Sequence, residues 1–309
     1  MPEKPALTID EQIILLKSRG MLFRDETQAA IYLKNISYYR LKGYWWDMQS
    51  DRVLHTMKPE TWFENIIDRY IFDHNLRIIL FDAIEHIEIA LRTKMIYHLS
   101  LAHGGLWYMN PDLFENKVIK LTDGTVKTVH QITINDLRKE IYRSHEIFIK
   151  DHRNRYPGQD ADAWKSLEVA SLGTLSKLYK NLKNQLPEKA VIAKEMGLNL
   201  HSELSSWLEA ISYLRNIVAH HSRLWSRNMV KKPVDQINNP IRKWFTHPLI
   251  PVQTKKPFLI ISCMVYLCNG IISNHHVKSR ILELICSNPE IPVYKLGFLN
   301  NWDKEPLWQ

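Results

Sequence analysis

One long run of apolar residues at helical spacing constrains the fold of this chain more than any other feature. It extends from a capping pattern at Thr61 and Glu64 to about Leu101. Spacings of three and four predict a single long helix, and its wide apolar face must be covered by other elements. The apolar positions are Ile71, Leu76, Ile79, Leu80, Ala83, Ile84, Ile87, Ala90, Leu91 and Met95.

Further helical patterns surround this run and are separated by short breaks. They cover about 134–151, 162–184 and 187–196, and a Thr8 and Glu11 capping box opens an earlier helix. Short connections favour helices that pack as one bundle. The sequence therefore predicts an all-α, multi-helix fold.

One segment departs from the helical pattern. Residues 117–129 carry strand formers on both sides of Asp123-Gly124, a pair typical of a type I′ hairpin turn. We expect one small β-hairpin excursion from the helical body. The predicted organisation is an N-terminal helical extension over 1–60, a helical body over 61–230, and a basic connector with C-terminal helices over 231–309.

The charge balance favours a polyanionic partner. Lys and Arg outnumber Asp and Glu by 41 to 33, which gives a net charge of +8 and a pI near 9.2. Such an excess suits nucleic acid, although a plain basic surface has the same composition. The three cysteines form no paired framework and no metal knuckle, so we expect no metal site, no cofactor and reduced thiols in the cytoplasm.

Nothing in the sequence predicts export or a membrane span. The first residues lack the basic and then apolar order of a leader peptide. The most apolar window, Phe258 to Ile272, is shorter than a bilayer requires and contains polar residues. We expect it to form a buried core helix.

Aromatic and basic residues alternate between Asn35 and Trp46. Tyr39, Arg40 and Lys42 in this stretch could stack on bases and hold phosphates. The alternative is that its aromatic residues only pack the first helices onto the body. Both interpretations stay open on the sequence alone.

Glu88 and Arg92 lie four residues apart in the long helix. They therefore share one face of a helix that is expected to be buried. The pair either forms a structural ion pair or lines a site, and the cost of burying one charge alone favours the ion pair.

The most informative pattern is a predicted helix from about Ser202 to Arg227. Its apolar stripe includes His221, which we expect to be a hydrogen-bonded core histidine. Four polar residues spaced by four, three and four share another face, with Arg215 beside them. They are Asn216, His220, Arg223 and Arg227.

This second face has the chemistry needed to cleave a phosphodiester. The Asn216 amide can orient the His220 imidazole, and the imidazole can move a proton. Guanidinium groups, with Arg215 and Arg223 foremost, can hold the phosphate and stabilise the growing charge. A solvated basic face with no catalytic role fits the same spacing.

Several motifs resemble known families. Arg215-Asn-Ile-Val-Ala-His220 resembles the Arg-Asn-x-x-x-His signature of the HEPN ribonuclease superfamily. The longer run from Leu214 to Trp225 resembles the Abi-like abortive-infection proteins of the AbiD/AbiF type. The same resemblance extends to Tyr38-Tyr39-Arg40-Leu41, Ile87 to Thr93, Leu296-Gly297-Phe298 and Trp302.

This resemblance implies a HEPN-like bundle and an antiviral, toxin-like RNA endonuclease. Such an enzyme uses no metal, leaves a 2′,3′-cyclic phosphate, and is associated with a small structured noncoding RNA. The family's sites are usually composite, so the resemblance also implies a homodimer or a second half-site within the chain. Arg92 to His98, near Glu88, gives a degenerate second motif with Thr93 where Asn is expected.

Two other functions remain open. The same face could belong to a non-catalytic RNA-binding module that signals by assembly. It could also belong to a HEPN toxin that is controlled by a partner enzyme.

Overall fold

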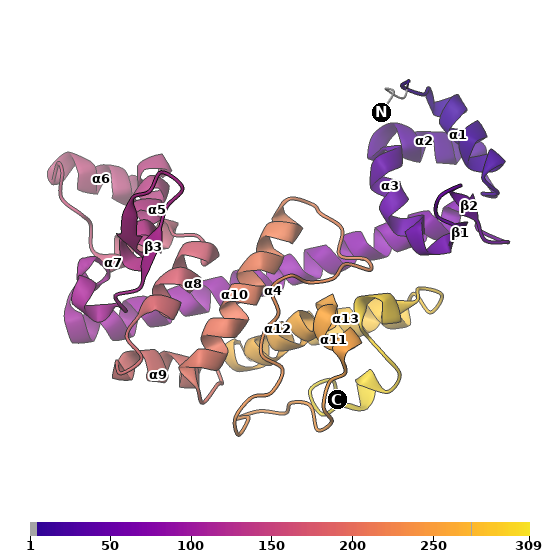
Figure 1. The fold of residues 1–309 in the computed structure, drawn as a ribbon. Coiled ribbons are helices and arrows are strands. Elements are labelled where there is room, and N and C mark those ends of the chain that lie inside the picture. The colour runs from indigo at the N-terminus through magenta and orange to yellow at the C-terminus, as the bar shows by residue number, and fades with distance from the viewer. Residues whose placement is uncertain (1–4, 273) are drawn as a thin grey trace.

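The fold is all-α, as predicted, and is organised around one long helix. The computed structural model describes residues 5–272 and 274–309. Figure 1 shows α4 running through the length of the molecule, with the N-terminal helices at one end and α5 to α7 at the other. The elements in chain order are α1 (Ile9–Ser18), α2 (Glu26–Ile36), α3 (Tyr38–Trp45), β1 (Gln49–Asp51), β2 (Thr56–Met57), α4 (Phe63–His103), β3 (Val118–Lys120), β4 (Val126–Thr128), α5 (Val129–Arg143), α6 (Ile147–Arg155), α7 (Ala163–Ser166), α8 (Leu172–Asn181), α9 (Pro187–Glu195), α10 (His201–Ala219), α11 (Pro251–Lys255), α12 (Pro257–Ile271) and α13 (Val277–Cys286).

The long helix has the buried face that its sequence predicts. Leu80, Ile87, Leu91 and Met95 of α4 are fully buried. Helices α8, α9, α10, α12 and α13 pack along α4 and cover this face. Burial of apolar surface contributes about 25 cal/mol per Å², so these contacts are the main stabilisation of the bundle.

The most apolar segment is a core helix, which confirms the prediction. Helix α12 is buried from Pro257 to Cys268 and packs against both α4 and α10. Within residues 5–272 and 274–309, no helix combines the length and the apolar character needed to cross a bilayer.

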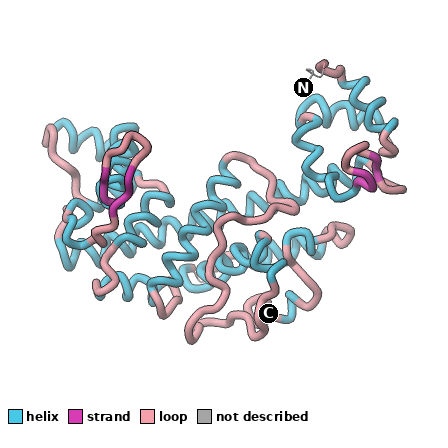
Figure 2. The backbone as a smooth tube through the Cα atoms, viewed as in Figure 1, coloured by secondary structure: helices cyan, strands magenta, loops and turns pink. Residues whose placement is uncertain are grey.

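Two small hairpins interrupt the helices, where the sequence predicted one. The expected hairpin pairs β3 with β4, and the additional one pairs β1 with β2. Figure 2 shows them at opposite ends of the molecule. The predicted type I′ turn is wrong, because the backbone has a positive φ at Gly124 (84°) but not at Asp123. The β3–β4 loop is longer than two residues, and the Leu121 amide donates to the Thr125 carbonyl across it.

Two predicted helices are broken in the structure. The pattern over 134–151 divides into α5 and α6 at residues 144–146, and the pattern over 162–184 divides into α7 and α8. Ser171 explains the second break, because its hydroxyl caps α8 by accepting from the Thr174 amide. The same hydroxyl donates to Glu140 of α5 at 2.7 Å, which fixes the position of the break. Local side-chain bonds of this kind compete with helix continuation.

Candidate functional site

The motif helix ends earlier than the sequence predicts. Helix α10 stops at Ala219, and His220 is its C-cap. The His221 amide donates to the Val218 carbonyl, and the Ser222 amide donates to the Ile217 carbonyl. This is a Schellman ending, in which the residue after the C-cap adopts the left-handed conformation. The predicted helix to Arg227 is therefore wrong.

His221 is the left-handed residue of this ending, and the prediction of a core histidine is wrong. Its φ is 54° and its side chain is exposed. Its carbonyl accepts hydrogen bonds from two guanidinium groups. One belongs to Arg40 of α3, and the other belongs to Arg77 of α4, whose bond is 2.8 Å long. A left-handed conformation costs about 1 kcal/mol in a residue other than glycine, and these two charge-assisted bonds offset it.

A buried carboxylate holds the turn that follows. Asp73 of α4 is 0% exposed and accepts from the backbone amides of Leu224 at 3.1 Å and Trp225 at 2.7 Å. The Tyr44 hydroxyl of α3 donates to the same carboxylate at 2.8 Å. Burial raises the pKa of Asp73, while the Tyr44 bond and the Arg77 charge act in the opposite direction. Asp73 was not among the predicted site residues, although its i,i+4 spacing with Arg77 on an apolar helix indicates a buried polar contact.

Arg215 lies beside the Glu88 and Arg92 pair. These three residues line a cavity of about 290 Å³, together with Phe81 and Ile89 of α4. Glu88 and Arg92 form the predicted ion pair at 2.7 Å, and Arg92 also donates to the Ala170 carbonyl. Burial raises the pKa of Glu88, and the charges of Arg92 and Arg215 oppose this shift. The Glu88 carboxylate therefore interacts electrostatically with the Arg215 guanidinium across this cavity.

The other two motif residues are accessible to solvent. Asn216 and His220 are both exposed. They are joined through the backbone, where the His220 amide donates to the Asn216 carbonyl at 3.1 Å. The expected bond from the Asn216 amide to the imidazole does not occur among the described residues. Arg215 and His220 lie about 7.5 Å apart along the helix axis, from the rise per residue.

Arg223 and Arg227 follow the turn and therefore do not share a helical face with His220. Arg223 lies against Gly43 of α3, where an added Cβ would approach its Nε to 2.8 Å. Its guanidinium donates to the Trp225 carbonyl, and burial lowers its pKa. Arg227 Nε donates to the Arg223 carbonyl at 2.7 Å. Both side chains thus take part in the structure of the turn and remain partly exposed.

The degenerate second motif is divided between two places. Arg92 faces the Arg215 cavity, whereas His98 Nε2 lies 2.9 Å from a Glu195 carboxylate oxygen on α9. Glu195 also pairs with Lys94. Glu88 and Arg92 therefore accompany Arg215, and His98 does not line that cavity.

The aromatic and basic stretch of α3 has two faces. Tyr44 and Trp45 are buried, as the packing interpretation expects, and Arg40 reaches the motif turn. Tyr39 is 81% exposed, and it lines a separate pocket together with Lys42. The sequence grouped Tyr39, Arg40 and Lys42, whereas the structure directs them to two different sites.

A known protein family matches the part of the chain that contains most of these site residues. Residues 31–226 match the family described as Abi-like protein, which is more than half of the chain. The chain belongs to the Abi-like family. The matched segment of this Abi-like chain includes α3, α4 and α10, the three helices that meet at the motif turn. No curated protein and no solved structure matches it.

Proposed function

We propose that this Abi-like protein is an abortive-infection RNA endonuclease of the HEPN type, of the AbiD/AbiF subtype. One observation carries the proposal. The exposed His220 imidazole, which has no side-chain partner among the described residues, follows five positions after Arg215, whose guanidinium lines a cavity. An imidazole with access to solvent can exchange protons with a bound RNA.

The proposed reaction needs no group beyond the protein and the RNA. His220 takes the proton of a 2′-hydroxyl or supplies one to the leaving 5′ oxygen. The 2′ oxygen bonds to phosphorus as the bond to the 5′ oxygen breaks, which gives a 2′,3′-cyclic phosphate and a 5′-hydroxyl. Arg215 stabilises the negative charge that grows on the phosphate. Asn216 contributes to RNA binding beside them, with Arg223 and Arg227 as further phosphate contacts.

An apolar stripe beside Arg215 supports a homodimer with a composite site. Ile71, Ile78, Phe81 and Ile89 lie on one face of α4 and are 42%, 50%, 45% and 47% exposed. Phe81 and Ile89 also line the Arg215 cavity, so a second copy on this stripe would bring its own motif near the first. We propose this arrangement, with Glu88 and Arg92 supporting Arg215 in each copy. Control by a small noncoding RNA in the cytoplasm belongs to the same proposal, and the charge of +8 suits it.

The test is RNA cleavage by the purified protein with EDTA present. We expect the wild type to cleave single-stranded RNA and His220→Ala to lose cleavage while it still binds RNA. His221→Asn is the matched control, because it removes the adjacent imidazole and tolerates the left-handed backbone. It should cleave as the wild type does.

Other outcomes separate the alternatives. Cleavage that survives in His220→Ala would contradict the proposal. RNA binding without cleavage by both proteins would favour the non-catalytic RNA-binding module. Binding should weaken steeply as salt rises, because phosphate contacts release counterions.

A further inference from the structure

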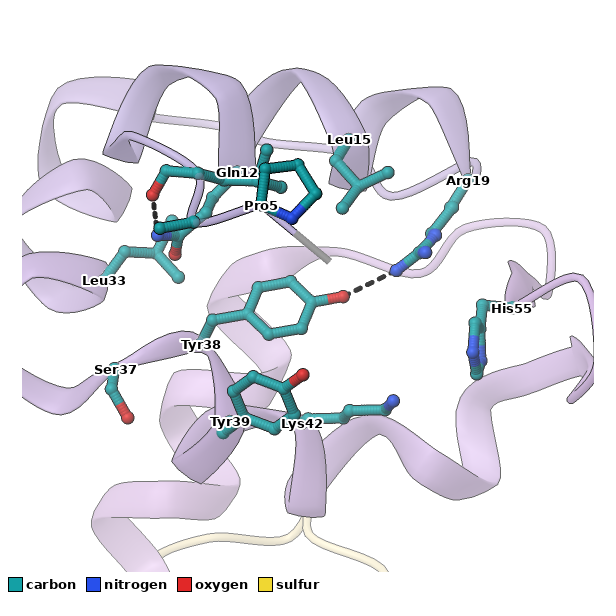
Figure 3. Close-up of a pocket in the computed structure, with 12 residues that line it drawn as sticks. Pro5, Gln12, Leu15, Arg19, Leu33, Ser37, Tyr38, Tyr39, Lys42 and His55 are labelled. Carbon is teal, nitrogen blue, oxygen red and sulfur yellow. Dashed lines mark hydrogen bonds between the residues drawn. The ribbon is translucent and has the colours of Figure 1, made fainter. Parts of the chain in front are cut away.

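The N-terminal helices enclose a pocket that shares no lining residue with the Arg215 cavity. Its volume is about 580 Å³, within the range of roughly 300 to 1,000 Å³ that is usual for small-molecule sites. Helices α1, α2 and α3 supply half of the lining residues, the segment before α1 supplies three more, and His55 closes the pocket from the β1–β2 connection. Figure 3 shows the arrangement of these side chains.

One end of the pocket is cationic. Arg19, Lys42 and His55 gather there in Figure 3, and none of the lining residues is Asp or Glu. In the described part of the chain, neither Arg19 nor Lys42 has a carboxylate within ion-pair distance. Arg19 donates to the Tyr38 hydroxyl at 2.6 Å, and Lys42 lies 5.8 Å from the Trp46 ring centre. These cations therefore suit an anionic ligand.

The rest of the pocket is mainly aromatic and apolar, with Gln12 and Ser37 as its polar residues. The rings of Tyr38 and Tyr39 meet edge to face with centroids 5.8 Å apart. Tyr39 is largely exposed, so its ring is available for stacking. Pro5 and Leu33 lie away from the cationic end in Figure 3. A planar ring fits beside these groups, since aromatic side chains stack on nucleobases of any sequence.

We propose that this pocket binds a nucleoside 5′-phosphate, with the base against Tyr39 and the apolar wall and the phosphate between Arg19 and Lys42. The ligand has this chemistry whether it is a free nucleotide or the 5′-terminal nucleotide of an RNA. The site goes beyond the proposed nuclease, because binding here requires neither His220 nor Arg215.

The test is calorimetric titration of the full-length protein with AMP, and separately with adenosine and inorganic phosphate. AMP should bind at one site per chain, and each partial ligand should bind about tenfold more weakly or worse, because stacking and charge act together. Lys42→Ala and Tyr39→Ala should each weaken AMP binding about tenfold. Lys34→Ala is the matched control, an exposed lysine of α2 that does not line the pocket, and it should leave binding unchanged.

A second titration distinguishes the two sources of the ligand. A short oligoribonucleotide with a 5′-phosphate is compared with its 5′-hydroxyl form in the His220→Ala protein, which lacks the imidazole of the proposed cleavage reaction. The ligand is an RNA end if the RNA binds more tightly than AMP and if its binding requires both the 5′-phosphate and Lys42. The ligand is a free nucleotide if AMP binds as tightly as the phosphorylated RNA.

Two results would overturn the proposal. One is the absence of binding by both AMP and the phosphorylated RNA. The other is binding that Lys42→Ala and Tyr39→Ala leave unchanged. Neither depends on cleavage, so failure of the pocket and failure of the nuclease remain distinguishable.

Discussion

The carboxylate of Asp73 accepts a hydrogen bond from the backbone amide of Trp225 at 2.7 Å, although the two residues are 152 positions apart in the sequence. This bond ties the N-terminal third of α4 to the turn that follows the motif helix. Tyr44 joins the same carboxylate from α3, so three separate segments of the family match meet at one buried oxygen pair. The position of His220 therefore depends on a residue outside its own motif.

Removal of this carboxylate should destabilise the protein strongly. Asp73→Ala leaves two amides, a hydroxyl and the Arg77 guanidinium without their shared partner, which we expect to cost about 3–5 kcal/mol in the free energy of unfolding. Tyr44→Phe removes one hydrogen bond and should cost about 1 kcal/mol. Urea denaturation followed by circular dichroism measures both. Asp136→Ala, which breaks only exposed ion pairs, should cost less than about 1 kcal/mol. Equal losses for Asp73→Ala and Asp136→Ala would contradict a structural role for the buried network.

Glu88 should position Arg215 for the proposed cleavage. Glu88→Gln removes the negative charge beside Arg215 and Arg92 but keeps the shape of the side chain. We expect kcat to fall about tenfold as the guanidinium loses its fixed orientation. KM should stay level or fall, because a more positive cavity attracts RNA. Single-turnover and steady-state kinetics on one RNA measure the two effects.

The matched control for this prediction is Glu85→Gln. Glu85 lines the same cavity but is exposed and forms no ion pair in the described part of the chain. It should leave kcat unchanged. A rise in KM with constant kcat in Glu88→Gln would assign Glu88 to binding rather than to positioning.

Most of the fold could be predicted from the regular spacing of apolar residues in this sequence. The spacing of apolar residues predicted α4 and α12, and the all-α class followed from it. The end of α10 was not predictable in this way, because His221 stands where glycine usually occupies the left-handed position. Its conformation depends on Arg40 and Arg77, which come from distant helices. Local propensity contains no information about such tertiary bonds.

The candidate site likewise has parts that short sequence spacings predict and parts that depend on tertiary contacts. The Arg215 to His220 motif and the Glu88–Arg92 pair were visible as short spacings within single helices. The role of Asp73 was not, since it acts on backbone amides at positions 224 and 225. Arg223 and Arg227 were assigned to the wrong face because the predicted helix continued past its true end.

The close approach of Gly43 to Arg223 should make a methyl group costly there. Glycine to alanine within a helix usually stabilises by about 0.5–1 kcal/mol. Gly43→Ala must instead displace the Arg223 side chain, so we expect it to be about 1 kcal/mol less stable than the wild type. Thermal or urea unfolding measures this change. Gly173→Ala in α8 is the control, because its new Cβ meets neighbours only at ordinary contact distances and should not destabilise. A stabilised Gly43→Ala protein would mean that Arg223 does not occupy this position.

The exposed stripe on α4 should determine the oligomeric state on which the composite site depends. Phe81→Asp places a charge at the centre of the apolar face, and burying that charge against a second copy would be costly. We expect sedimentation analysis to show a dimer for the wild type and a monomer for Phe81→Asp, with RNA cleavage falling as the dimer is lost. Ile14→Asp, on an exposed face of α1 at 65% exposure, is the matched control and should remain dimeric. A wild-type monomer that cleaves RNA would show that one copy of the motif suffices, and Glu88 and Arg92 would then be the nearest candidates for completing the site from within the chain.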